Sequence, residues 1–218
     1  MTVREEAHNY IEELRRTRGS ETADKLLSYI DMALERNEHI NLTAIRDRDE
    51  AVIKHLADSL SISELPEFWD AQNIIDVGTG AGFPGALLAI ACPEKYFVLL
   101  DSTRKRLRVI DEFAETLGIN NLMTVHARAE EANRQEMHES FDLCVSRAVA
   151  NLTTLSSWCL PFVRKGGTFV AYKGENYADE IEAASPTVAK LGAAFDRAVP
   201  ADSGYDSIKD HVLLVINK

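Results

Sequence analysis

Apolar residues in the N-terminal third of the chain follow a helical pattern. Between residues 23 and 34 they recur three and four positions apart, which predicts a helix with one buried face. Ser20 can act as its N-cap and Asn37 can end it. A second stripe covers residues 52–60, after a short N-L-T-A-I segment at 41–45. We therefore expect a helical extension over residues 1–65.

From residue 66 onward, short apolar runs alternate with helical patterns. Strands are expected at 73–77, 96–100, 122–126, 141–146 and, after a Gly166–Gly167 turn, 167–172; helices are expected at 86–91, 103–117 (ended by Gly118), 151–160 and 177–191. Two last runs, 193–199 and 211–216, have no clear helix between them and predict an antiparallel hairpin. This alternation predicts an α/β domain over residues 66–218, with a mostly parallel sheet covered on both faces. The hairpin favours a seven-stranded sheet over six parallel strands.

Four glycines follow the first expected strand, at the place where an α/β sheet binds a nucleotide-like ligand. They are Gly78, Gly80, Gly82 and Gly85. Glycine permits a positive φ and lets a ligand approach the backbone closely. Strand, glycine turn and helix together predict a ligand site at this turn.

Two motifs overlap in this turn. G-x-G-x-x-G, with Asp101 about 20 residues further on, is the dinucleotide-binding pattern. D-x-G-x-G-x-G, starting at Asp76, is typical of methyltransferases that use S-adenosylmethionine. A pyrophosphate needs a free helix N-terminus, whereas an acid beside the turn suits a cationic ligand such as a sulfonium. Asp76 therefore favours S-adenosylmethionine.

Composition limits the function classes. The chain of 218 residues, with 45% hydrophobic and 27% charged residues, is an ordinary globular protein. No apolar run approaches the roughly 20 residues of a membrane span, and the N-terminus has no signal-peptide core. Three widely spaced cysteines without a C-x-x-C pattern fit a reducing compartment, so a cytoplasmic protein is expected. The same pattern argues against disulfides and a structural zinc site, and no metal is expected. A net charge of −11 argues against general nucleic-acid binding and leaves only a local basic patch for RNA.

Candidate ligand residues follow the expected strands. Asp101 ends the second strand, where it can accept hydrogen bonds from ribose hydroxyls or serve as a helix N-cap. Ala129 and Glu130 follow the third strand; they can bind adenine, although Glu130 also fits the first turn of a helix. Arg147 ends the fourth strand. Because an unpaired buried guanidinium is costly, it should bind a carboxylate, a phosphate or a guanine edge.

His55 and Asp58 share a helix face with Ser59 in the second apolar stripe. Two interpretations remain open. The pair can act in acid–base chemistry or contact substrate, or it can be a hydrogen-bonded pair that fixes the extension to the main domain.

Ordered motifs along the chain resemble one family closely. They are D-V-G-T-G-A-G-F-P-G at 76–85, L-L-D-S-x-x-K-R at 99–106, R-A-E at 128–130, S-R-A-V-A at 146–150 and Y-K-G at 172–174, with N-L-T-A-I and H-x-x-D-S-L in the extension. Together they resemble the bacterial small-subunit ribosomal RNA methyltransferase G family, also called the glucose-inhibited division protein B family. The resemblance implies a Rossmann-like, seven-stranded class I methyltransferase fold and methylation of guanosine N7 in 16S ribosomal RNA with S-adenosylmethionine. The resemblance assigns cofactor binding to Gly78, Phe83, Ala129, Glu130 and Arg147. The glycine pattern of the turn adds Gly80 and Gly82. The expected hydrogen bonds from ribose hydroxyls add Asp101.

Guanine N7 carries a lone pair and no proton, so no essential general base is expected and Arg147 should act in positioning. Basic residues near the strand ends are candidates for RNA binding: Arg104, Lys105, Arg106, Arg147 and Lys173. The cluster that begins at Arg104 can instead be the solvent-exposed face of a helix. Tyr172 is an aromatic candidate for stacking an unpaired guanine. Small-subunit ribosomal RNA or an assembling small subunit is the expected partner. The rival hypotheses are a small-molecule methyltransferase and a non-catalytic nucleotide-binding regulatory module.

Overall fold

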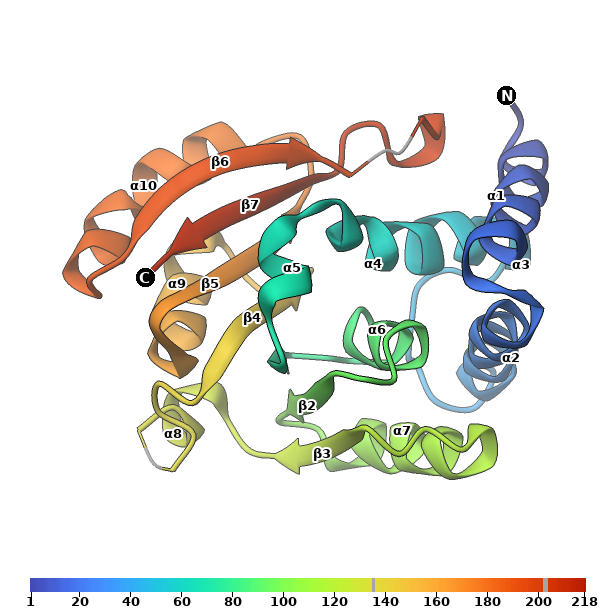
Figure 1. Ribbon diagram of the computed structural model, residues 1–218, viewed down its shortest axis with the longest axis horizontal. Coiled ribbons are helices and arrows are strands. Elements are labelled where there is room, and N and C mark those ends of the chain that lie inside the picture. The colour runs from blue at the N-terminus through green and yellow to red at the C-terminus, as the bar shows by residue number, and fades with distance from the viewer. Residues whose placement is uncertain (135, 202–203) are drawn as a thin grey trace.

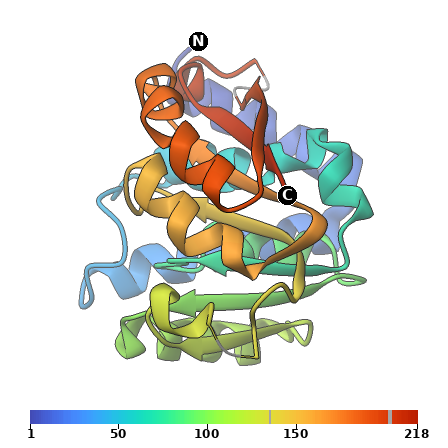
Figure 2. The same ribbon diagram turned by 90° about the vertical axis from the view of Figure 1, so that its left-hand side faces the viewer.

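A seven-stranded sheet with helices on both faces forms the centre of the molecule (Figures 1 and 2). The structure, a computed structural model, describes residues 1–134, 136–201 and 204–218. The strands lie in the order β3-β2-β1-β4-β5-β7-β6. Their bounds are β1 Asn73–Val77, β2 Tyr96–Asp101, β3 Leu122–His126, β4 Phe141–Arg147, β5 Val163–Lys173, β6 Ala194–Pro200 and β7 Val212–Asn217.

Strands β1 to β5 pair in parallel, and β7 pairs antiparallel with both β5 and β6. The expected C-terminal hairpin and the seven-stranded, mostly parallel sheet are therefore confirmed. The place of β1 between β2 and β4 matters for the site. After β1 the chain continues to β2 and β3 on one side of β1, and it then crosses to β4 on the other side. Ligands of open α/β sheets bind at such a reversal, beyond the carboxyl ends of the strands.

The helices and single turns complete the chain. Their bounds are α1 Val3–Arg18, α2 Ser20–Asn37, α3 Arg48–Ala51, η1 Val52–Ala57, α4 Asp58–Leu60, η2 Ser61–Glu64, α5 Pro66–Asp70, α6 Gly85–Ala91, α7 Arg104–Leu117, α8 Ala129–Ala132, α9 Leu152–Cys159, η3 Leu160–Phe162, α10 Tyr177–Lys190 and η4 Asp206–Ile208. In Figure 1, α9 and α10 lie to the left of the sheet and α1 to α4 lie together to its right.

The pleat of the sheet divides the core into two layers, because successive side chains of a strand face opposite sides. On β1, Ile74 belongs to the apolar cluster that includes residues of α2, α6 and α7. Its neighbour Ile75 belongs to the cluster that includes residues of α9 and α10. The near-continuous apolar character of the parallel strands follows from this burial on both faces.

The extension packs on the first of these layers. The apolar cluster runs without a break from α1 and α2 through the sheet. In α2, the buried Tyr29 hydroxyl donates a hydrogen bond to the carbonyl of Ala81 in the glycine turn, at 2.9 Å. Helix α5 begins at Pro66, next to the expected division of the chain at residue 65, which stays a prediction.

Three local expectations are wrong. Ser20 is the first residue of α2 rather than its cap, because α1 runs to Arg18 and Gly19, at a φ of 81°, joins the two helices. Residues Val52–Ala57 form a π-helix, so the α-helical spacing assumed for the second stripe does not hold. The Gly166–Gly167 pair lies inside β5, whose strand begins at Val163.

Candidate active site

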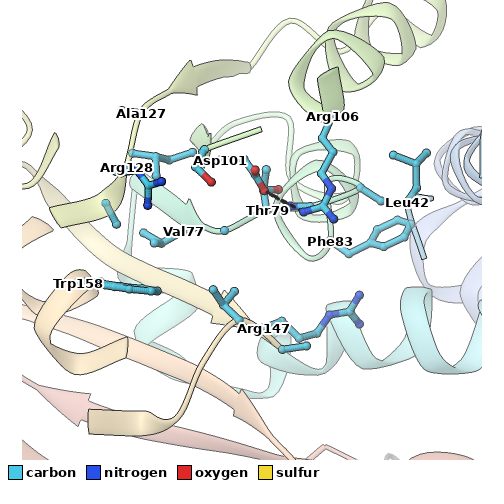
Figure 3. Close-up of a pocket in the computed structure, with 18 of the residues that line it drawn as sticks. Leu42, Val77, Thr79, Phe83, Asp101, Arg106, Ala127, Arg128, Arg147 and Trp158 are labelled. Carbon is cyan, nitrogen blue, oxygen red and sulfur yellow. Dashed lines mark hydrogen bonds and ion pairs between the residues drawn. The ribbon is translucent and has the colours of Figure 1, made fainter. Parts of the chain in front are cut away.

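A cavity of about 450 Å³ lies at the carboxyl ends of β1, β2, β3 and β4 (Figure 3). The structure brings most of the expected cofactor residues to its wall: Gly78, Gly80, Phe83, Asp101, Ala129, Glu130 and Arg147. Figure 3 shows Trp158 and Arg128 at one side of this cavity and Phe83 and Arg106 at the other.

Gly82 differs from the other turn glycines, because it is not among the residues that line the cavity. Its α-carbon faces α2, where an added Cβ would lie 2.1 Å from the hydroxyl oxygen of Tyr29. Gly80, by contrast, has a φ of 60° and only the carbonyl oxygen of Gly78 within 4.0 Å of a built Cβ. Gly82 therefore permits helix packing, while Gly80 leaves open space on the cavity side.

Asp101 holds the turn and the next loop together. One carboxylate oxygen accepts a hydrogen bond from the Gly80 N–H at 3.0 Å and the other accepts from the Thr103 N–H at 2.7 Å. The N-cap position of α7 is occupied by Thr103, so Asp101 is not the cap of that helix. Each carboxylate oxygen has a second lone pair, which leaves acceptor capacity for a ligand hydroxyl.

Asp76 decides between the two motifs in the glycine turn. Its carboxylate is buried beneath the turn and accepts a hydrogen bond from the N–H of Gly85, the first residue of α6, at 2.9 Å. Burial raises the pKa of Asp76 to about 6, so the carboxylate is mostly charged at neutral pH. A pyrophosphate at this helix start would meet an occupied donor and a negative charge. A ligand with a positive group fits the acidic site.

Arg147 joins the main sheet to the helical extension. At the end of β4, its guanidinium donates hydrogen bonds to the Asp58 carboxylate at 2.8 Å and to the Lys54 carbonyl at 3.0 Å. It also lies over the ring of Phe83, 5.6 Å from the centroid. The expectation of a carboxylate partner is met inside the protein. Arg147 is thus held at the cavity wall by groups from η1 and α4.

His55 does not pair with Asp58, which corrects the hydrogen-bonded pair expected from their spacing. The π-helical turn places the imidazole beside Arg147, with Nδ1 3.2 Å from the guanidinium Nη2. Because arginine can only donate, Nδ1 accepts and the proton lies on Nε2, which donates to the Thr43 hydroxyl at 2.7 Å. Asp58 instead contacts His211 through its other oxygen, at 2.9 Å.

The environment keeps His55 neutral. Burial, reinforced by the positive charge of Arg147, lowers the pKa of His55 to about 3. Its ring stacks on Phe83 with the centroids 4.6 Å apart. With Nδ1 committed to Arg147 and Nε2 to Thr43, this histidine is a fixed wall of the cavity rather than a group that exchanges protons.

The extension supplies part of the cavity wall through the N-L-T-A-I segment. The side chain of Asn37 organises this segment: its oxygen accepts from the N–H groups of Leu42 and Thr43, and its nitrogen donates to the carbonyls of Thr43 and Ile45. Leu42 and Thr43 consequently line the cavity. The motif alone did not show this position.

Other cavity residues were not identified from the sequence. Trp158 lies on α9, and nothing in the apolar pattern of that helix distinguishes its inner face from its outer one. Val149 follows β4 and packs against the glycine turn, since a Cβ built on Gly78 would lie 2.6 Å from it. Both residues add apolar surface to the cavity wall.

The expected RNA residues fall into different environments. Arg104 and Lys105 are exposed at the start of α7, and Arg106 turns toward the cavity, 3.9 Å from Asp101. Lys173 points inward, where its amine contacts the Ala150 carbonyl at 2.8 Å and Glu180 at 2.6 Å. Tyr172 is also buried and donates to the carbonyl of Ser59, so no face of its ring lies open at the surface.

The cavity fits a nucleoside that carries a positive group. Asp101 offers carboxylate acceptors, and Trp158 and Ala129 offer apolar surface. Asp76 does not line the cavity, but its buried carboxylate supplies negative charge beneath the turn. Among the described residues, no group of three His, Cys, Asp or Glu side chains could hold a metal ion. Within the same part of the chain, no helix is long and apolar enough to cross a membrane.

Comparison with known proteins agrees with this geometry. A family model described as GidB, rRNA small subunit methyltransferase G, matches residues 22–204. The chain is 40% identical over 193 residues to the ribosomal RNA small subunit methyltransferase G of Clostridium tetani, covering 88% of this chain and 80% of that protein.

Two solved structures share the fold. A ribosomal protein L11 methylase from Lactobacillus delbrueckii subsp. bulgaricus matches with a TM-score of 0.55 at 18% identity, over 79% of each chain. A branched-chain polyamine synthase from Thermus thermophilus matches with a TM-score of 0.63 at 12% identity, over 88% of this chain and 63% of the other. At such identities the likeness concerns architecture alone. The family model and the sequence relatives go further, and the chain belongs to the GidB family, rRNA small subunit methyltransferase G.

Proposed function

We propose that this chain transfers a methyl group from S-adenosylmethionine to N7 of a guanosine in small-subunit 16S ribosomal RNA. The observation that carries the proposal is membership of the GidB family over most of the chain. The cavity supports it, because carboxylates and apolar side chains surround a glycine turn that has no free pyrophosphate site. The cofactor supplies an electrophilic methyl group on a sulfonium.

The same cavity supports an assignment of cofactor contacts. Asp101 accepts from the ribose hydroxyls, and Ala129 and Glu130 lie where the adenine binds, with Trp158 as apolar surface beside it. Gly78 and Gly80 leave room for the amino-acid part next to the turn, and Phe83 and Arg147 form the wall on the side of the extension. Gly82 acts through the packing of α2.

The acceptor chemistry needs positioning more than proton transfer. Guanine N7 presents an in-plane lone pair, so the reaction requires alignment with the methyl group and no base. Arg147, which is held by Asp58, His55 and the Lys54 carbonyl, is a positioning residue in this proposal. A neutral His55 is consistent with the same chemistry.

RNA binding comes from a local basic surface on an acidic protein. Arg104 and Lys105 are exposed beside the cavity mouth and can contact phosphates, while Arg106 lies closer to the cofactor. We propose that residues 1–65 act as a helical extension that completes the site through Leu42, Thr43, His55 and Asp58. Ribosomal RNA or an assembling small subunit in the cytoplasm is the proposed partner.

Methyl transfer from labelled cofactor tests the proposal. Purified small-subunit RNA, small-subunit particles and a panel of small metabolites would be incubated with the protein. Label in the RNA as N7-methylguanosine supports the proposal. Label in a metabolite instead would favour a small-molecule enzyme, and cofactor binding without any turnover would favour a regulatory module.

A further inference from the structure

A second cavity of about 350 Å³ adjoins the first, between the η1–α4 segment, the ends of β4 and β5, and the start of β7. The two cavities share His55, Arg147 and Ala148 in their walls. They are therefore neighbouring cavities with a shared wall. This volume lies within the range of small-molecule sites, at the carboxyl ends of the strands where ligands bind.

Most polar side chains that line the second cavity are already committed to partners. Lys54 pairs with Glu50 at 2.6 Å. The Tyr172 hydroxyl donates to the Ser59 carbonyl, and Lys173 contacts Glu180. Each of these groups would lose its present hydrogen bond or ion pair if it turned toward a ligand.

His211 differs from these lining residues, because only one of its two ring nitrogens has a partner among the described residues. Its Nδ1 lies 2.9 Å from Asp58, whose side chain is 2% exposed. Although burial opposes the charge of Asp58, hydrogen bonding from His211 and the charge of Arg147 outweigh it and hold the pKa of that carboxyl below its ordinary value. Because an ionised carboxylate only accepts, Nδ1 of His211 donates.

This contact occupies one ring nitrogen of His211 and leaves Nε2 for a ligand. In a neutral imidazole with a proton on Nδ1, Nε2 is a hydrogen-bond acceptor. The described residues provide no hydrogen-bond partner for Nε2, and the half-exposed ring forms part of the cavity wall. With His211 in this neutral form, the second cavity presents one oriented acceptor, held in place by the buried carboxylate of Asp58.

We propose that the second cavity receives the acceptor guanine of the RNA, and that Nε2 of His211 accepts a hydrogen bond from its Watson–Crick edge. The inference rests on the proposed function. Guanine carries an N1–H donor and an exocyclic amine on that edge, whereas adenine has an acceptor at N1. Unpaired bases are commonly recognised on this edge. This contact uses the Watson–Crick edge and leaves N7 unengaged, as methylation from the neighbouring cavity requires.

Two substitutions of His211 separate ligand contact from support of Asp58. In His211→Asn the amide can still donate to Asp58 but has no atom at the position of Nε2. In His211→Gln the longer side chain can place an amide oxygen near that position. We expect kcat/KM for RNA to fall about 10- to 100-fold in His211→Asn, the usual effect of losing a hydrogen bond to a substrate donor, and less in His211→Gln.

Calorimetric affinity for S-adenosylmethionine should be unchanged in both variants, because His211 does not line the first cavity. His8→Asn, at an exposed histidine in α1, is the matched control and should behave as wild type. A His211→Asn protein with wild-type kcat/KM, or one that loses cofactor affinity in parallel, would overturn the proposal.

A substrate change tests the same contact without altering the protein. RNA with 1-methylguanosine at the target lacks the N1–H donor and carries a methyl group in its place. We expect wild-type protein to methylate it at least about tenfold more slowly than the unmodified RNA, by the same argument. Equal rates would exclude recognition of this edge while leaving the methyltransferase assignment intact, whereas no methylation of unmodified RNA would reject the proposed function itself.

Discussion

Asp58→Asn is the substitution whose cost follows most directly from the structure. Asp58 is the buried carboxylate between Arg147 and His211, at 2.8 Å and 2.9 Å. Arg147 is itself only 12% exposed, so removal of the negative charge leaves a buried guanidinium without its counter-charge. Breaking a buried pair from one side typically costs about 3–5 kcal/mol. Since asparagine keeps one carbonyl acceptor, we expect a loss of about 3 kcal/mol.

Urea unfolding at pH 7 measures this loss as a change in the free energy of unfolding. Asp31→Asn is the control, because Asp31 pairs with Arg48 at 2.6 Å but both side chains are nearly half exposed. That pair should contribute no more than about 1 kcal/mol. A loss for Asp58→Asn no greater than that of the control would refute the structural role of this carboxylate.

The pH dependence provides a second check on Asp58. Its pKa is lower in the folded protein than in the unfolded chain, so the stabilisation is present above the ordinary carboxyl pKa and is lost as the pH falls through the folded value. The difference between wild type and Asp58→Asn should therefore shrink below about pH 4. A difference that stays constant down to pH 3 would contradict this assignment.

Four further predictions concern the cofactor, the RNA, proton transfer and the contribution of His55 to stability. Asp101→Asn should weaken S-adenosylmethionine binding by about 1–3 kcal/mol in calorimetry, while a drop in melting temperature alone would restrict Asp101 to supporting the turn. Charge reversal at Arg104 and Lys105 should weaken RNA binding and reduce its salt dependence, while cofactor affinity stays unchanged. An unaltered salt dependence would show that both residues belong to a solvent-exposed helix face that does not contact RNA. His55→Gln should reduce the single-turnover rate of methylation by less than about tenfold, and the wild-type rate should not change with pH from about pH 6 to 9. A thousandfold loss in the variant, with a wild-type rate that titrates near pH 6.5, would reveal an essential base. Because its folded pKa of about 3 lies below the ordinary 6.5, His55 should also make the free energy of unfolding rise with pH between these values, a slope that His55→Gln removes.

The strands of the sheet could be predicted from the sequence because each strand is marked by the residues within it and next to it. Each buried parallel strand is a short apolar run between polar turns, and β1 and β3 were predicted with their observed bounds. The residues of the first cavity were found for a related reason. Gly78 directly follows β1, Asp101 ends β2 and Arg147 ends β4, and the carboxyl ends of parallel strands meet at one edge.

What the sequence did not show depends on distant contacts. The π-helical turn that separates His55 from Asp58 has the same apolar pattern as an α-helix. His211 lies 153 positions from Asp58, and no local motif marks it. Trp158 could be assigned to a helix but not to the face of that helix. These positions depend on tertiary packing, which periodicity does not encode.

Methylation of N7 of one guanosine in small-subunit ribosomal RNA is the activity proposed for this protein. The most direct measurement maps N7-methylguanosine along that RNA, by chemical cleavage at the modified base, from cells with and without the protein. We predict one site that is modified when the protein is present, unmodified when it is removed, and restored by wild-type protein. An unchanged pattern of N7-methylguanosine after removal would contradict this function.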